Sequence, residues 1–265
     1  CISGSGTPSM SSVGLPRRIE DFVGREQVMQ DIMRLLCRNM RRIVVLHCAS
    51  SHGRTATLVE TAHFVAAPGR AFSGRCAFLS CRRECPAGSS SRPWAVPGAA
   101  GGLLVVDDAD HVLAEETGRG LEREALRRHL DIPGARLLLG CRCAQYEIFG
   151  GAVKAAHVAL TPLQPFEAAR LFLNCTHRPL VAADLLTAEE LGRRRCAAGE
   201  VLEHKRAMEL LLARLTALGG DPGVLRRAAA CVTPGLPPLN GDLARLRLMA
   251  ESRGARPESA GSWYT

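Results

Sequence analysis

Two neighbouring aspartates, Asp107 and Asp108, are the residues of this chain whose position points most strongly to chemistry. They directly follow the four apolar residues 103–106, a pattern typical of a strand that is buried on both faces of a parallel sheet. A carboxylate at the end of such a strand can hold a hydrated Mg²⁺ ion. The pair therefore predicts one half of a phosphate and magnesium site.

The segment CASSHGRT at 48–55 predicts the other half. A short apolar strand precedes it and a helical pattern follows it, which is the strand, loop and helix order of a P-loop. Against the pattern GxxxxGK[ST], Cys48 replaces the first glycine and Arg54 replaces the lysine, whereas Gly53 and Thr55 are retained. A Cβ hinders the inward turn of the loop, and a forked guanidinium is not equivalent to a compact ammonium. We therefore expect a metal-binding hydroxyl and a helix N-terminus beside a weakened phosphate cradle.

Further segments follow one another in a recognisable order. The run at 15–36 precedes the loop and has apolar residues at helical spacing after Arg25. The later segments are a charged helix, a strand and two mixed stretches, at 121–130, 135–143, 157–173 and 215–232. In this order the chain resembles the NB-ARC and wider STAND group of P-loop NTPases, over roughly residues 15–232. Members of that group act as nucleotide-operated switches in cell-death, immune and regulatory signalling.

The resemblance implies nucleotide contacts for the matching residues. The segment FVGRE would line the base and sugar side of the pocket, and the proline of GGDPG would pack against the base from a small helical subdomain. Phosphate contacts would come from the loop and from the first turn of the following helix. The nucleotide-binding candidates are Val23, Gly24, Arg25, Cys48, Gly53, Arg54, Thr55, Thr57 and Pro222.

The same resemblance implies metal and catalytic roles. Thr55 and Asp107 would hold Mg²⁺, and Asp108 would orient the attacking water. Arg142, just past LLLG in the strand segment at 135–143, would sense the terminal phosphate. The expected cofactors are therefore ADP or ATP with Mg²⁺. The departures at Cys48 and Arg54 argue against tight ATP binding and rapid hydrolysis.

The expected fold class is α/β, with a three-layer P-loop NTPase core and a mainly parallel five-stranded sheet, followed by a small helical subdomain. We assign residues 15–160 to the nucleotide-binding domain and 161–233 to the helical subdomain. Residues 1–14 and 234–265 are expected to be flexible segments. Cys1 stands where an initiator methionine would be, so we expect a fragment or a processed chain.

Two local expectations concern one crossover of the sheet and one helix of the subdomain. A short strand is predicted at 75–81, but the Pro-, Gly- and Ser-rich residues 82–102 have no helical periodicity. A crossover helix would then be missing there, leaving one face of the sheet thinly covered. The run at 191–215 predicts one amphipathic helix. Its inward-facing residues would be Leu202, Met208, Leu211 and Leu215.

Composition narrows the class of protein. The chain has 265 residues and a net charge of +8, but its arginines are dispersed and only 4% of its residues are aromatic. Without a basic stripe, stacking aromatics or zinc-finger spacing, specific nucleic-acid binding is not expected. No apolar run approaches the ~20 residues of a membrane span, so we expect no membrane contact, and the resemblance implies a cytoplasmic protein. Eleven cysteines form no CxxC pair, which favours reduced thiols over a metal or disulfide framework.

Three functions remain open at this point. The first is a STAND-like switch that binds adenine nucleotide, is a weak ATPase at most, and acts on an unidentified protein partner or by self-association. The second is a degenerate P-loop domain that binds no nucleotide and serves as a protein-interaction scaffold. The third is an Arg-rich, nucleic-acid-associated ATPase. Retention of Asp107, Asp108, Thr55 and Arg142 favours the switch, whereas Cys48 and Arg54 favour the scaffold.

Overall fold

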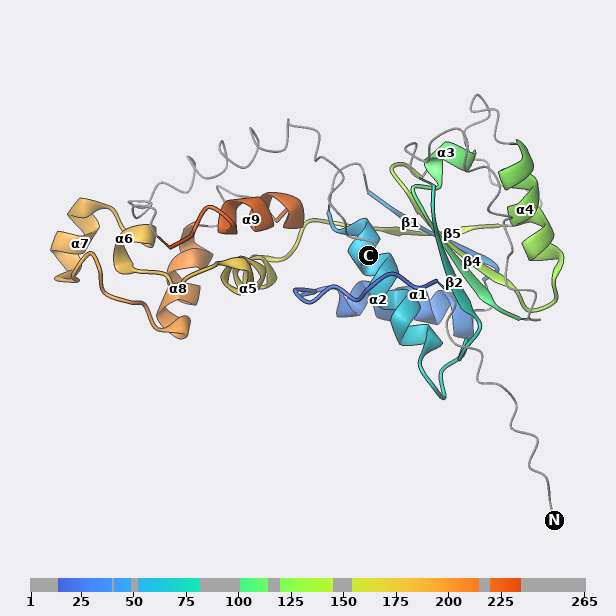
Figure 1. Cartoon of the computed structure of the whole chain (residues 1–265), viewed down its shortest axis with the longest axis horizontal. Helices are drawn as coiled ribbons and strands as arrows, with labels where there is room; N and C mark the ends of the chain where they lie inside the picture. The colour runs from blue at the N-terminus through green and yellow to red at the C-terminus, as the bar shows by residue number, and fades with distance from the viewer. Residues whose placement is uncertain are drawn as a thin grey trace, which may run out of the picture.

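Five strands between Ile43 and Ala159 form one sheet (Figure 1). The computed structural model describes residues 14–39, 41–48, 52–81, 101–113, 120–144, 154–214 and 220–234. The strands are β1 (Ile43–His47), β2 (Cys76–Ser80), β3 (Leu103–Asp107), β4 (Arg136–Cys141) and β5 (Ala156–Ala159). Their order is β2-β3-β4-β1-β5, and every pairing among them is parallel. The predicted parallel five-stranded sheet is confirmed.

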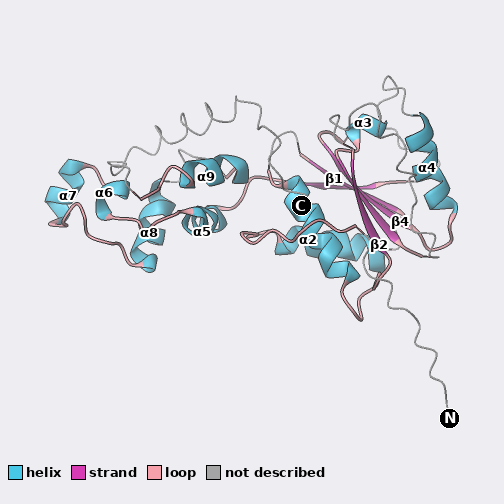
Figure 2. Cartoon of the chain, viewed as in Figure 1, coloured by secondary structure: helices cyan, strands magenta, loops and turns pink. Residues whose placement is uncertain are grey.

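Helices cover both faces of this sheet, which gives the expected three layers (Figure 2). One face packs against α1 (Glu26–Met33), its π-helical continuation η1 (Arg34–Arg38) and α2 (Arg54–Ala66). The other face packs against α3 (Asp110–Leu113) and α4 (Gly120–Asp131). Alternate residues of β1, β3 and β4 enter the two cores, so these strands need the continuous apolar runs seen in the sequence.

The expected thin cover over one face is not seen in the described residues. The side chains of β3 and β4 that point toward α3 and α4 are buried among the apolar residues of those helices. The Pro-, Gly- and Ser-rich segment on which that expectation rested lies almost wholly outside the described residues, since 82–100 are not among them.

A second group of helices follows the sheet and has its own apolar core. We call it the helical lobe, and the sheet with its covering helices the sheet lobe. The helical lobe consists of α5 (Pro165–Cys175), α6 (Ala182–Leu185), α7 (Ala188–Arg194), α8 (His204–Arg214) and α9 (Pro222–Ala229). Figure 1 shows it to one side of the sheet lobe, joined through the segment between β5 and α5.

The prediction of one helix over 191–215 is wrong. α7 ends at Arg194 because Arg195 adopts a left-handed conformation with φ 54°, and α8 begins only at His204. The connecting residues pair with the start of α6 instead, through hydrogen bonds from Ala182 N–H to Glu200 O and from Ala183 N–H to Ala198 O. Leu202 is buried from this connection, Met208 and Leu211 are buried on α8, and Leu215 lies outside the described residues.

Candidate functional site

The candidate phosphate loop joins β1 to α2 at the carboxyl edge of the sheet. Cys48 ends the strand side, and its N–H donates to Cys141 O at 3.2 Å. Gly53 forms the N-cap of α2 with φ 82°, a left-handed conformation that glycine adopts without strain. Gly53 O accepts both the N–H of Thr57, at 2.9 Å, and its hydroxyl, at 3.0 Å. Thr57 therefore fixes the first turn of α2 from inside, while residues 49–51 lie outside the described residues.

Cys48 differs from what its sequence position suggested. Its φ is not positive, so the backbone at this position does not require glycine. The side chain is buried, and burial raises the pKa of the thiol although the charges of Arg54 and Arg25 act in the opposite direction. Cys48 is thus a neutral thiol that packs in the apolar core between the sheet and α2.

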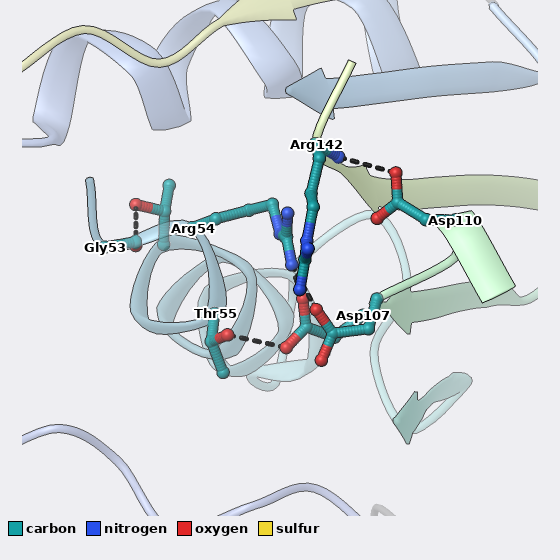
Figure 3. A network of polar contacts seen from close by, with 8 residues as sticks. Gly53, Arg54, Thr55, Asp107, Asp110 and Arg142 are labelled. Carbon is teal, nitrogen blue, oxygen red and sulfur yellow. Dashed lines mark hydrogen bonds and ion pairs between the residues drawn. The ribbon is translucent and has the colours of Figure 1, made fainter. Parts of the chain in front are cut away.

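Arg54 connects the two predicted halves of the site (Figure 3). Its Nε lies 3.3 Å from Asp107 Oδ1, and its Nη2 donates to Asp108 Oδ1. The hydroxyl of Thr55 donates to Asp107 Oδ2 at 2.6 Å. The Arg54 side chain is only 11% exposed and that of Asp107 only 1%. Four of the predicted site residues, Arg54, Thr55, Asp107 and Asp108, therefore meet in one largely buried network.

Burial and charge oppose each other in this network. Burial alone would lower the pKa of Arg54, but the carboxylates of Asp107 and Asp108 raise it above its ordinary value. Burial raises the pKa of Asp107, while the Thr55 hydroxyl and Arg54 favour its charged form. The guanidinium is thus firmly charged, and Asp107 depends on its two partners to stay ionised.

Asp108 and Gly140 shape the floor of the site. Asp108 is one of two described non-glycine residues with positive φ, at 52°, which turns the chain sharply after β3. A Cβ at Gly140 would lie 3.0 Å from Asp107 Oδ1 and 3.3 Å from Arg54 Cδ. Glycine at that position in β4 therefore leaves the room in which the ion pair forms.

Asp110 belongs to the same site and was not among the predicted residues. Its Oδ1 accepts the backbone N–H of Arg142 at 2.8 Å, while its Oδ2 is buried without a hydrogen-bond partner. Arg142 is exposed, and Figure 3 shows its side chain extending in the direction of Asp107. The sequence signal that could have identified Asp110 is its place as the third acid in the run DDAD, at the start of a short helix.

The residues predicted to line the base lie where the two lobes meet. Val23 and Arg25 are buried, and Arg25 Nη2 donates to His52 O of the phosphate loop at 2.9 Å. Burial lowers the pKa of Arg25, and the charge of Glu167 on α5 partly restores it. Gly24 has φ +68°, and a Cβ there would lie 2.5 Å from Glu167 Cγ. The segment before the loop is therefore packed against the helical lobe.

Pro222 reaches the phosphate loop from the opposite direction. It is the first residue of α9, whose N-cap Asp221 accepts the N–H groups of Gly223 and Val224. A Cβ at Gly53 would lie 3.4 Å from Pro222 Cγ, within van der Waals contact. Predicted nucleotide contacts from both lobes are thus brought together at the start of α2.

These residues fit a magnesium nucleotide in type and position. Thr55 and Asp107 present hard oxygen ligands side by side, and Gly53 is the N-cap of the helix on which Thr55 lies, so the N–H groups of its first turn are available to an anion. Among the described residues, no three His, Cys, Asp or Glu side chains gather as a metal site of their own. A Mg²⁺ ion at this site would accordingly complete its coordination with phosphate oxygens and water.

Solved structures share this arrangement of strands and helices. PCH-2 of C. elegans superimposes with a TM-score of 0.56 at 9% identity, covering 89% of this chain and 72% of that one. The Walker-type ATPase Paby2304 of Pyrococcus abyssi gives a TM-score of 0.52 at 10% identity, covering 92% of this chain and 76% of that one. The chain has a P-loop NTPase fold.

At such low identities the likeness establishes the P-loop NTPase fold and no finer family. No protein-family model matches the sequence, and no curated protein does. In this P-loop NTPase fold the loop at 48–55 follows the strand that lies between β4 and β5. Within the described ranges, no helix is both long enough and apolar enough to cross a membrane.

Proposed function

We propose that the protein is a STAND-type molecular switch that binds an adenine nucleotide with Mg²⁺ and hydrolyses ATP slowly or not at all. The observation that carries this proposal is the meeting of Arg54, Thr55 and Asp107 at the start of α2, under a proline of the helical lobe. The assignment to adenine nucleotides and to signalling rests on the resemblance over residues 15–232.

In this proposal the phosphates bind at the N-terminus of α2. The N–H groups that follow Gly53 hold phosphate oxygens, and Arg142 approaches the terminal phosphate from the end of β4. Thr55 and Asp107 hold Mg²⁺, which when bound neutralises phosphate charge. Slow hydrolysis follows from Asp108, because a carboxylate already paired with a guanidinium is a poor acceptor for the proton of an attacking water.

Switching would arise from the contacts that join the lobes at this site. Arg25 links the phosphate loop to Glu167 of α5 electrostatically, and Gly53 lies beside Pro222 of α9, so that a Cβ on Gly53 would contact the proline. A nucleotide seated between these elements favours whichever arrangement of the lobes it binds more tightly, by its difference in affinity. Small-angle scattering should show a more compact particle with saturating ADP. An unchanged radius with bound ADP would mean a rigid binding protein.

Calorimetric titration with ADP and ATP, with and without Mg²⁺, tests the binding itself. We expect binding that requires Mg²⁺ and that weakens in Thr55→Val and Asp107→Asn, since each replacement keeps the shape and removes a metal ligand. Arg17→Gln is a matched control, because it removes an exposed charge from the same lobe away from the site. Absence of heat and of any thermal shift at millimolar nucleotide would sink the proposal.

A second candidate function is a scaffold that binds no nucleotide. One observation favours it: Arg54 already satisfies Asp107 and Asp108, so the acids need no ligand to be neutralised. A protein partner or self-association would then be the whole function. Light scattering with and without ATP separates the two candidates, because only the switch should change its association state with nucleotide.

A further inference from the structure

We propose that Arg54 is an ion-pair lock that makes Mg²⁺ and the nucleotide bind as a pair, with neither binding well alone. This inference rests on the proposed function and concerns how the same site is regulated. Both oxygens of Asp107 are already engaged, Oδ1 by Arg54 Nε at 3.3 Å and Oδ2 by the Thr55 hydroxyl at 2.6 Å. The other arm of the guanidinium holds Asp108.

A divalent cation arriving alone meets a fixed positive charge at its own ligand. Asp107 can accept it only by giving up Arg54, whose buried guanidinium would then lie beside a second cation. The stem of Arg54 lies beside Gly140, where a Cβ would lie 3.3 Å from its Cδ, so glycine at that position is what lets the guanidinium reach the acids. Removing one partner of a buried pair leaves an uncompensated charge, which strongly opposes the exchange.

A nucleotide arriving without metal meets the opposite difficulty. Its phosphates would draw Arg54 away and leave Asp107 and Asp108 buried without their counter-charge. Asp110 makes this worse, because its buried Oδ2 has no hydrogen-bond partner and the charge of Asp110 also acts on Arg54. The phosphates would therefore enter a site with excess negative charge.

Both difficulties vanish when the two ligands arrive together. Asp107 exchanges Arg54 for the metal, and Arg54 Nε exchanges Asp107 for a phosphate oxygen while Nη2 keeps Asp108, so each of these three side chains has a partner of opposite charge. Arginine suits this role better than lysine, because its fork reaches two carboxylates at once whereas an ammonium is a single point charge. Arg54, which replaces the lysine of the P-loop pattern, would thus have a function of its own, because it couples the binding of the metal to that of the nucleotide.

Mn²⁺ binding followed by electron paramagnetic resonance tests the lock without any turnover. Affinities for Mn²⁺ alone, for ADP with EDTA, and for Mn²⁺ with ADP are compared in the wild type, Arg54→Gln and Arg54→Lys. The matched control is Arg18→Gln, which removes an arginine paired with Glu60 of α2 away from the site. In the wild type, ADP should raise Mn²⁺ affinity by about 100-fold, within the usual range of coupling between sites.

In Arg54→Gln we expect Mn²⁺ alone to bind about tenfold more tightly or better, and the coupling to ADP to fall below about fivefold. Arg18→Gln should behave as the wild type. Equal Mn²⁺ affinity in wild type and Arg54→Gln would overturn the lock, even if ADP binds. If Arg54→Gln does not fold, Arg54→Lys decides, since it should also bind Mn²⁺ alone more tightly, and equality with the wild type overturns the lock.

Failure of the proposed function would look different. No ADP binding to any variant, with Mn²⁺ still gaining affinity on Arg54→Gln, would show a blocked metal site without a nucleotide. That result would refute both the switch and the coupling. Equal Mn²⁺ affinities in the wild type and Arg54→Gln, together with normal ADP binding, would refute only the lock.

Discussion

Substituting Gly24 tests whether the two lobes are truly in contact at the nucleotide side of the site. Gly24 has φ +68°, and a Cβ there would lie 2.5 Å from Glu167 Cγ and 2.6 Å from both Cβ and Cδ. Glu167 cannot simply swing away, because its Oε2 caps α5 by accepting Gln164 N–H at 3.0 Å and its own Cβ is part of the clash. Gly24→Ala must therefore separate α5 from the segment before the loop.

The size of the effect follows from two contributions. A left-handed alanine costs about 1 kcal/mol in the free energy of unfolding, and overpacking adds about 1–3 kcal/mol. Gly69→Ala is the matched control, because Gly69 has a similar φ of +73° but nothing lies within 4 Å of its would-be Cβ. The difference between the variants, about 1–3 kcal/mol, isolates the contact between the lobes.

Urea unfolding of the two variants and hydrogen exchange in the first turn of α5 measure this difference. If the ligand needs the lobes in contact, ADP affinity should fall by about 5- to 100-fold in Gly24→Ala and stay unchanged in Gly69→Ala. Adding Glu167→Ala to Gly24→Ala removes two of the three clashing atoms and should recover part of the loss. Equal destabilisation by both glycine substitutions would refute the reasoning.

Three further perturbations probe other contacts of the fold. Burial lowers the pKa of His129 from its ordinary value of 6.5, so the unfolded chain binds the proton more readily than the folded protein does. The stability that the neutral histidine contributes is therefore fully present above about pH 6.5 and is lost as the pH falls through the folded-state pKa. Urea unfolding at about pH 8 and about pH 5 should show this loss in the wild type and much less of it in His129→Gln. Asp184→Asn should cost about 3–5 kcal/mol, because the fully buried carboxylate pairs with Arg178 at 2.6 and 2.8 Å. Denaturation should find no comparable change in the exposed control Glu189→Gln, and similar losses in both would contradict this account. Asp221→Ala removes the acceptor of two N–H groups at the start of α9 and should cost about 1 kcal/mol. Thermal unfolding measures that cost, and a simultaneous loss of ADP affinity is expected because α9 begins beside the phosphate loop.

The parts of the fold that could be predicted were those governed by local pattern. The apolar runs of β1, β3 and β4 predicted buried parallel strands, and the carboxyl ends of parallel strands meet at one edge. For that reason Thr55 and Asp107, far apart in sequence, were expected at one site, and the Thr55 hydroxyl does lie 2.6 Å from Asp107 Oδ2. Their roles toward a nucleotide stay predictions.

The remainder depended on tertiary structure that no local pattern contains. The fork of Arg54 across two acids depends on the left-handed turn at Asp108 and on the room left by Gly140. Asp110 gained its place from a backbone N–H of the neighbouring strand end, at Arg142. Periodicity continued through Arg195, but pairing with α6 outweighed it and divided the helix.

The strand order has a consequence for how the chain folds. Among the described strands β1 pairs with β4 and β5, which begin at Arg136 and Ala156, whereas β2 and β3 are neighbours of each other. During synthesis β1 therefore waits with both hydrogen-bonding edges open until most of the sheet lobe has been made. Closing so long a loop is entropically costly and slow, and open apolar edges invite aggregation. The strand that leads into the phosphate loop therefore gains both its neighbours only after β5 has been made.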